Sequence, residues 1–360
     1  MQLGFSKLKQ KYLGHNLIFI ISQPRSGSTL LQRILYGHPK IQTSAETWLM
    51  LHPCYSLKEN GISTEYDSHF AALGTKEFIE NYTDGFEVYD DAIRQWAKVI
   101  YTNAINKHNK EYFLDKTPRY FFIIEDLYRL FPKAKFIFLL RNPMAILASE
   151  LKTYIKGDWP VLSVFRPDLV EAPNLIIKGI KQVGDDAHVV KYEELVSNPE
   201  TEVKNICKYL EMPFHQGMIE YSQTPVPKGV MNDQAGIHKY TKPSISSIDR
   251  WKLMADDPQN MHFAIAYLET LGPRLIEKIG YDYKEIYNYL VSNSVKKSSR
   301  LIYPWSRAIC PKEELTLWER FLSRRYFYIR LNGKIIGNFK AGINGIMRMF
   351  VYFKRKISST

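Results

Sequence analysis

The sequence predicts an α/β fold in which a central parallel sheet is flanked by helices. Short apolar runs recur along the chain, and each is followed by a turn and then by a segment of helical periodicity. The runs are apolar at nearly every position, which is typical of strands buried on both faces of a parallel sheet. In such sheets ligands bind beyond the carboxyl ends of the strands, so the residues at those ends are candidate site residues.

Four strand–helix units carry this prediction. We expect strands over Asn16–Ser22, Glu111–Asp115, Lys135–Leu140 and His188–Tyr192, and helices over Thr29–Tyr36, Tyr120–Leu130, Pro143–Tyr154 and Pro199–Leu210. Proline at the first position of the third helix is favourable, because its fixed φ suits a helix start. Residues 155–187 and 211–285 are less regular. Within them, residues 224–247 predict a long loop over the sheet, either functional or simply solvated.

The composition excludes several classes of protein. The chain has 360 residues, of which 45% are hydrophobic, enough for one large domain or two small ones. Its three cysteines, Cys54, Cys207 and Cys310, are widely spaced and form neither a disulfide framework nor a zinc-binding pattern. The apolar run near the start is too short for a signal peptide, and none is long enough to span a membrane. We therefore expect a cytoplasmic protein.

The positive charge is confined to the C-terminal part of the sequence. Residues 296–360 hold fifteen Lys or Arg against three Glu, so they carry the whole net charge of +12. We therefore expect an α/β domain over residues 1–290 and a basic, aromatic-rich helical extension over 296–360. Apolar residues at helical spacing alternate with cations there, which suits peripheral contact with an anionic membrane surface. The alternative is that the apolar stripe docks on the domain itself.

The loop PRSGST, residues 24–29, follows the first predicted strand and opens a helix. Glycine lets the backbone approach an anion closely, and the N–H groups of the helix start point toward it. The candidate phosphate-binding residues are Arg25, Ser26, Gly27, Ser28 and Thr29. The alternative is a plain strand–helix turn with a surface arginine. The loop lacks the Lys-Ser or Lys-Thr ending of a nucleotide P-loop, which disfavours an ATPase or GTPase.

A second candidate site lies in KFIFLLRNPMAILASE. Arg141 follows a predicted strand, and Ser149 lies about two helical turns further along the chain. The two side chains could hold a second phosphate together. Taken singly, Arg141 is better explained as a surface or salt-bridged residue, and Ser149 as a residue on the surface of a helix.

Taken together, the two stretches resemble the sulfotransferase superfamily, in separate patches over roughly residues 15–285. The similar branch contains tyrosylprotein sulfotransferases and many bacterial enzymes, whose loop begins with Arg. The resemblance implies a P-loop-like fold and the donor 3′-phosphoadenosine 5′-phosphosulfate (PAPS), without a metal. QPRSGSTLLQRIL resembles the 5′-phosphosulfate loop, and FIFLLRNPMAILASE resembles the 3′-phosphate motif, which implies that Arg141 and Ser149 bind the 3′-phosphate. KYEELVSNPE and YTKPSISSIDRWK resemble two further family stretches, which implies cofactor contacts from Tyr192 and Lys242.

The resemblance also implies an in-line transfer of a sulfuryl group to an acceptor hydroxyl, with Arg25 and Lys116 stabilising the charge. In DKTPRY, Pro118 stands where the steroid and phenol branch has its catalytic His. The tyrosylprotein branch uses a Glu after the first helix, and the matching residue is Glu46. A carboxylate so placed can accept a hydroxyl proton. Glu46 could instead cap a helix or face solvent, and His38 and His52 are alternative bases, although His38 is better explained as holding a turn.

Two other functions stay open on the sequence alone. One is a P-loop phosphotransferase, and the other is an anionic-surface binder acting through residues 296–360. Nucleic acid is a poor fit, because no recognition motif accompanies the basic extension. The sequence does not identify the acceptor, which could be a glycan, a lipid or a small molecule. We expect residues 50–110 and 155–187 to select it.

Overall fold

The computed structural model describes residues 11–221, 224–229, 242–293, 302–311 and 314. The chain divides into two compact units. In the described part, the first unit contains residues 11–142, 172–249 and 278–281, and the second contains 143–171, 250–277 and the residues from 282 onward. The predicted boundary between a domain over 1–290 and an extension over 296–360 remains a prediction, since most of residues 296–360 lie outside the described residues.

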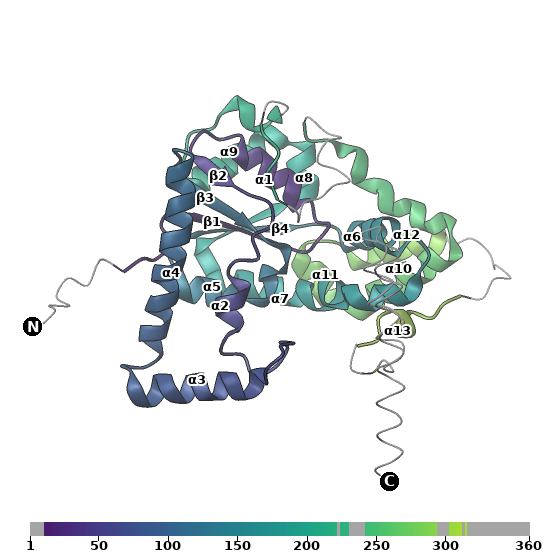
Figure 1. The fold of residues 1–360 in the computed structure, drawn as a ribbon. Helices are drawn as coiled ribbons and strands as arrows, with labels where there is room; N and C mark the ends of the chain where they lie inside the picture. Colours follow the sequence, from purple (N-terminus) through teal and green to yellow (C-terminus); the bar gives the residue numbers. More distant parts are fainter. Residues whose placement is uncertain (1–10, 222–223, 230–241, 294–301, 312–313, 315–360) are drawn as a thin grey trace, which may run out of the picture. The chain divides into compact units, whose positions relative to one another are not determined.

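The first unit is built on a five-stranded, fully parallel sheet with the strand order β2-β3-β1-β4-β5. The strands are β1 (Leu17–Ser22), β2 (Ile41–Thr43), β3 (Tyr112–Lys116), β4 (Lys135–Leu140) and β5 (Ala187–Lys191). All six residues of β1 are buried, as its nearly continuous apolar sequence predicts for a central strand. The α/β fold with a central parallel sheet is therefore confirmed (Figure 1).

Helices cover both faces of this sheet, as Figure 1 shows. The helices α1 (Ser28–Tyr36), α8 (Tyr192–Ser197) and α9 (Pro199–Leu210) lie on one side of the strands, and α5 (Ile124–Leu130) and α7 (Ala172–Val183) lie on the other. The unit also contains α2 (Leu51–Tyr55), α3 (Ser68–Tyr82) and α4 (Phe86–Lys107). The strand order places the segment after β2 beside the end of β3, which positions part of the candidate site.

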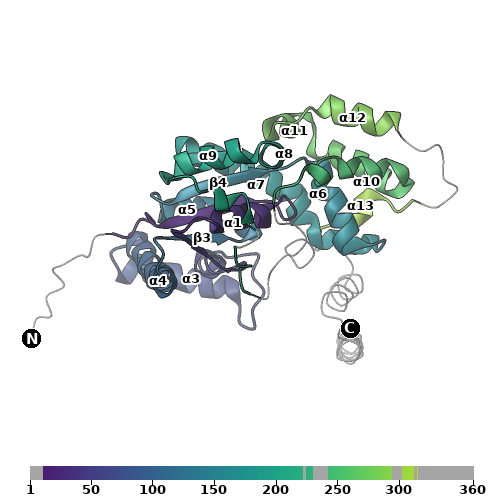
Figure 2. The ribbon, with the colours of Figure 1, turned by 90° about the horizontal axis from the view of Figure 1, so that it is seen from above.

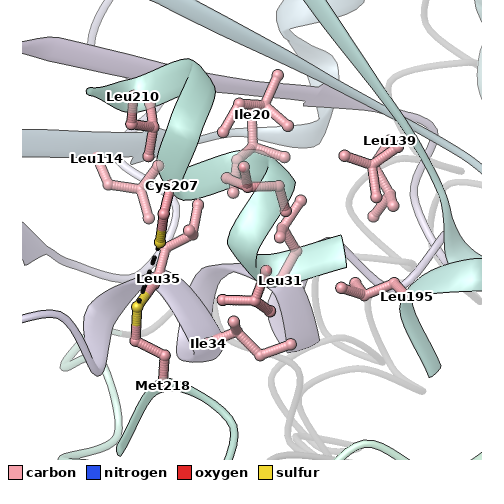
Figure 3. Packing of buried hydrophobic residues seen from close by; sticks show 14 of the residues in the cluster. Ile20, Leu31, Ile34, Leu35, Leu114, Leu139, Leu195, Cys207, Leu210 and Met218 are labelled. Atoms are coloured by element: carbon pink, nitrogen blue, oxygen red, sulfur yellow. Dashed lines mark hydrogen bonds between the residues drawn. The ribbon is translucent and has the colours of Figure 1, made fainter. Parts of the chain in front are cut away.

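The hydrophobic core under α1 and α9 follows from side-chain alternation along the strands. Ile20, Leu114 and Leu139 point from three neighbouring strands toward Leu31, Ile34 and Leu35 of α1 and toward Leu210 of α9 (Figure 3). Cys207 and Met218 bring their sulfur atoms to 3.7 Å in the same cluster. This packing anchors α1, and so it also anchors the loop that precedes α1.

The second unit is helical in the part that the structure describes. Its helices are α6 (Pro143–Glu150), α10 (Pro258–Leu271), α12 (Tyr283–Ser292) and α13 (Trp305–Ala308), while α11 (Pro273–Ile279) crosses the boundary between units. Both views show α6, α10, α12 and α13 grouped together (Figures 1 and 2). The ring of Phe263 packs against Trp159 and Trp305, with centroids 5.3 and 5.6 Å apart. Trp305, which belongs to the predicted extension, is thus buried in this unit.

Several predicted boundaries were wrong in detail. The short strand β2 was not predicted, because three residues carry too little pattern. Tyr192 begins α8 rather than ending β5. The helix expected over Tyr120–Leu130 is a 3₁₀ turn followed by α5, and the helix expected over Pro143–Tyr154 changes to a π-helical turn after Glu150. Much of the loop expected over 224–247 lies outside the described residues.

Candidate active site

The loop between β1 and α1 is a tight turn at the carboxyl end of the central strand. Gly27 precedes α1 and has a left-handed φ of 95°, and Arg25 is also left-handed with a φ of 66°. Ser26 lies between them fully buried, and its Oγ donates to the carbonyl oxygen of Gln23 at 2.7 Å. Left-handed residues in a turn make backbone N–H groups converge, and the start of α1 adds further N–H groups. The loop therefore has the form of an anion-binding concavity.

Gly27 is required by packing as well as by its backbone conformation. A Cβ atom added at this position would lie 2.4 Å from Cδ2 of Tyr192, which is closer than any real contact. The aromatic ring of Tyr192 therefore lies directly against the loop backbone. Two stretches that the sequence predicted separately, PRSGST and KYEEL, are brought together in this way.

Arg141 completes this group of side chains from the end of β4. Only 9% of the residue is exposed, and its guanidinium carbon lies 4.1 Å from the centroid of the Tyr192 ring. Its Nη1 donates to the carbonyl of Arg25 at 2.8 Å and its Nη2 to the carbonyl of Ser247 at 3.2 Å. Its Nε has no hydrogen-bond partner among the described residues. Burial lowers the pKa of Arg141 from its ordinary value, although Tyr192 and Glu193 oppose this.

Three supporting residues around Arg141 were missed by the sequence reasoning. Ser247 pairs its Oγ with the hydroxyl of Tyr192 at 2.6 Å. The Glu193 carboxylate accepts the backbone N–H of Asn142 at 3.1 Å and the hydroxyl of Tyr281. Glu193 and Ser247 lie within the stretches KYEELVSNPE and YTKPSISSIDRWK, in which the sequence assigned a role only to Tyr192 and Lys242.

Glu46 and Lys116 form an ion pair at the end of β3. The Lys116 Nζ donates to Glu46 Oε1 at 3.0 Å. The Lys116 side chain is 1% exposed and that of Glu46 is 18% exposed, so the carboxylate is the member of the pair with access to solvent. The alternative in which Glu46 caps a helix is wrong, because α2 begins at Leu51 after Met50. The structure thus joins the two residues that the sequence proposed for the reaction.

The two histidine alternatives differ from this pair in their surroundings. His38 is buried, its Nδ1 accepts the N–H of Lys40 at 3.2 Å, and its Nε2 lies 3.1 Å from the carbonyl of Pro213. Both ring nitrogens are therefore engaged, and burial lowers the pKa of the imidazole. The expectation that His38 holds a turn is confirmed. His52 is exposed on α2.

Four other predicted site residues lie at the start of α1, on α6 and beside a range that is not described. Ser28 and Thr29 begin α1, and Ser28 is buried. Ser149 lies on α6 in the second unit, so its role beside Arg141 stays a prediction. Lys242 is exposed and borders residues that are not described, so its role also stays a prediction.

The described residues contain neither a metal-binding cluster nor a helix suited to spanning a membrane. They contain no group of three or more His, Cys, Asp or Glu side chains that could hold a metal ion. Within the same ranges, no helix combines the length and the apolar character that crossing a membrane requires.

Comparison with known proteins finds several protein-tyrosine sulfotransferases among the matches. The chain is 26% identical to protein-tyrosine sulfotransferase 1 of Homo sapiens over 278 residues, covering 74% of this chain and 70% of the human protein. It is 31% identical to the nodulation protein NoeE of Sinorhizobium fredii over 212 residues, which is 53% of this chain and 48% of NoeE. The chain thus spans about half the length of NoeE.

Solved structures of sulfotransferases also resemble the chain. The sulfotransferase domain from the curacin biosynthetic pathway is 21% identical, covers 74% of this chain and 97% of its own length, and has a TM-score of 0.49. The sequence model described as "Sulfotransferase family" matches residues 17–216, which include the loop, the ion pair, Arg141 and Tyr192. That match covers more than half of the chain, and the protein belongs to the sulfotransferase family.

Proposed function

We propose that the protein transfers a sulfuryl group from PAPS to a hydroxyl group of an acceptor. The observation that carries the proposal is the setting of Arg141, a buried cation beside an anion-binding turn. Two of its nitrogens bond neutral carbonyl oxygens, and its Nε has no hydrogen-bond partner among the described residues. Hydrogen bonds from a guanidinium to a phosphate are stronger than those to neutral acceptors. Family membership makes PAPS the expected donor.

The residues present fit a donor with two separate anionic groups. The turn at Arg25–Gly27 offers backbone N–H groups and the start of α1. Arg141 offers a second, separate positive charge at the end of β4. We assign Arg25, Ser26, Gly27, Ser28 and Thr29 to the 5′-phosphosulfate, and Arg141 with Ser149 to the 3′-phosphate. Tyr192 and Lys242 are assigned as further contacts with the nucleotide.

The ion pair supplies the acid–base chemistry in this proposal. When bound, PAPS provides the activated sulfuryl group and, in its adenosine phosphate, the leaving group. Glu46 is the partly exposed member of the pair, and its carboxylate takes the proton from the acceptor hydroxyl. Lys116 holds Glu46 in place through its Nζ and places a positive charge where negative charge develops. Arg25 adds a second positive charge from the loop.

The acceptor is proposed only as a hydroxyl compound, whether a glycan, a lipid or a small molecule. Several relatives are named protein-tyrosine sulfotransferases, so a tyrosine phenol belongs in the first set of acceptors to be tried. We further propose a cytoplasmic location, with peripheral membrane contact through residues 296–360. Most of those residues lie outside the described ranges. A phosphotransferase is not proposed, because the chain belongs to the sulfotransferase family.

Calorimetric binding without added metal tests the donor. The ligands are 3′-phosphoadenosine 5′-phosphate (PAP), AMP and ATP, each titrated into wild type and Arg141→Ala. We expect wild type to prefer PAP, and we expect the substitution to weaken PAP binding by roughly 10- to 100-fold, the value of one or two charged hydrogen bonds. AMP binding should change little.

Arg129→Ala is the matched control, because Arg129 is half exposed and pairs with Asp126 and Asp90. It should leave PAP affinity unchanged. Equal affinity for PAP and AMP in wild type would show that the loop binds a different phosphate, and the assignment of PAPS would be withdrawn.

A further inference from the structure

Two consecutive residues at the end of β3 hold two consecutive residues of the segment that follows β2. Lys116 bonds Glu46 at 3.0 Å, and both Asp115 carboxylate oxygens accept from Thr47 Oγ1 at 2.9 Å. Successive side chains of a strand point to opposite faces, so the two contacts lie on different sides of β3. Glu46 is therefore restrained through its own side chain and through that of its neighbour.

Asp115 is the centre of a larger set of hydroxyl groups. It is only 1% exposed. Besides Thr47, its carboxylate accepts from the hydroxyls of Tyr101 at 2.6 Å, Tyr120 at 2.9 Å and Thr117 at 3.4 Å. A carboxylate that accepts several hydrogen bonds in a buried setting fixes the orientation of every donor around it.

Three of these hydroxyls accept hydrogen bonds from backbone N–H groups of the residues that follow Glu46. The N–H of Trp48 donates to Thr117 Oγ1 at 3.2 Å, and the N–H of Met50 donates to the Tyr120 hydroxyl at 3.1 Å. Between them, the N–H of Leu49 donates to Thr47 Oγ1 at 3.2 Å. Three successive amides thus reach the Asp115 carboxylate through one hydroxyl each.

This segment needs an external restraint because of its backbone. Trp48 has a φ of 55°, a left-handed conformation that a bulky residue rarely adopts. Such residues persist only where surrounding contacts determine them. On the other side of Glu46, the N–H of Ala45 donates to the carbonyl of Lys228 at 3.0 Å. The backbone is therefore held on both sides of Glu46.

We propose that Asp115 is a positioning residue for the base, acting through the hydroxyls of Thr47, Thr117 and Tyr120. Among the described residues the Asp115 carboxylate accepts hydrogen bonds from hydroxyl groups rather than from the Lys116 ammonium, and it fixes the turn that places the Glu46 carboxylate beside Lys116. The inference rests on the proposed role of Glu46. The contacts of Asp115 themselves do not depend on that role.

Hydrogen exchange of the three amides gives a readout other than activity. The variants are Thr47→Val, which keeps the side-chain shape and removes the hydroxyl, Thr47→Ser, which restores the hydroxyl, and Asp115→Asn. We expect exchange at Trp48, Leu49 and Met50 to be roughly tenfold faster in Thr47→Val, because a lost hydrogen bond lowers local protection. Thr47→Ser should return to the wild-type rate, and Asp115→Asn should follow Thr47→Val.

Thr43→Val is the matched control. Thr43 is a buried threonine, whereas Thr47 is partly buried, and the Thr43 Oγ1 donates to the carbonyl of Leu114 rather than to Asp115. It should leave exchange at residues 48–50 unchanged. If Asp115→Asn fails to fold, the pair of Thr47 variants still decides the result.

Kinetics and binding on the same variants separate positioning from general damage. PAP release from PAPS is measured with 4-nitrophenol and with water as acceptors, and PAP affinity is measured by calorimetry. We expect Thr47→Val to lower kcat roughly tenfold or more while PAP affinity stays within about twofold, with rescue by Thr47→Ser. Unchanged exchange in Thr47→Val, or faster exchange with an unchanged kcat, would overturn the inference. Absence of PAP binding in wild type would overturn the proposed function instead, and exchange would still report on the Asp115 contacts.

Discussion

The donor-side region around Arg141 and the reacting region around Glu46 are built in opposite ways. Around Arg141 a buried cation is surrounded by an aromatic ring and neutral carbonyl oxygens, and its Nε has no partner among the described residues. Around Glu46 each charge already has a partner: Lys116 bonds Glu46, and the Asp115 carboxylate accepts from several hydroxyls. The first region is prepared for an anion, whereas in the second region the charged groups already have partners, which are a counter-charge for Glu46 and neutral hydroxyls for Asp115.

This difference indicates how the two regions contribute to the reaction. A buried guanidinium bonded to neutral acceptors gains most from an incoming phosphate, so the first region is suited to affinity. A set of side chains fixed before substrate arrives needs little rearrangement in the transition state, so the second region is suited to rate. Substitutions in the two regions should therefore separate binding from turnover.

The largest effect is expected for Glu46→Gln. The amide keeps the shape of the side chain but cannot take a proton, so turnover should fall by roughly 100-fold or more. PAP affinity should stay within about twofold, because the substitution lies in the reacting region. PAP release measures turnover, and calorimetry measures PAP affinity.

Glu111→Gln is the control for this substitution, because Glu111 is a surface carboxylate paired with Lys40 at 2.8 Å. It should behave like wild type. Full turnover in Glu46→Gln would remove Glu46 from the mechanism.

Gly27→Ala should have the next largest effect, and on binding first. The added Cβ would lie 2.4 Å from the Tyr192 ring at a φ of 95°, so the loop must move. We expect PAP affinity to fall by roughly 10-fold or more and the free energy of unfolding by about 1–3 kcal/mol. Calorimetry and urea denaturation measure the two changes.

Gly184→Ala is the control, because it introduces backbone strain without a steric clash. Gly184 also has a positive φ, of 63°, but a Cβ there meets nothing within 4 Å. It should cost only about 1 kcal/mol of stability and leave PAP affinity unchanged. Equal effects of both substitutions on PAP affinity would show that contact with Tyr192 does not shape the loop.

The smallest effect concerns the stability of the reacting region as pH changes. Burial raises the pKa of Asp115 above the ordinary carboxyl value of 3.8, and hydrogen bonds from Tyr101, Thr47 and Tyr120 oppose this only in part. The pKa of Asp115 is therefore higher in the folded protein than in the unfolded chain. At a pH between these two values, the folded protein keeps a proton that the unfolded chain has released. Because the unfolded state binds fewer protons, the free energy of unfolding contributed by Asp115 decreases as pH rises through this window, by at most about 1.4 kcal/mol per pH unit.

Urea denaturation over a series of pH values measures this contribution. Asp115→Asn should lack the decrease, because an amide does not titrate, whereas Asp84→Asn at an exposed position should retain it. An identical pH dependence in wild type and Asp115→Asn would mean that the buried charge costs no stability. The contrast between the two regions would then be weaker.

The sequence by itself determined the parallel α/β fold and the strand ends at which Arg25, Lys116 and Arg141 lie. Continuous apolar runs and the helix starts that follow them are local patterns, and local patterns can be read from one chain. The resemblance in two separated motifs likewise indicated the family from the sequence alone.

Only the tertiary structure decided which of these residues meet. Glu46 and Lys116 are 70 residues apart in sequence, and Thr47 and Asp115 are 68 apart. Their contacts depend on the position of β2 beside β3, and β2 is a three-residue strand without a readable pattern. Ser247 and Tyr281 reach the surroundings of Arg141 from still more distant segments. Periodicity specifies which face of an element is buried, whereas the order of strands and the path of loops specify which distant side chains come into contact.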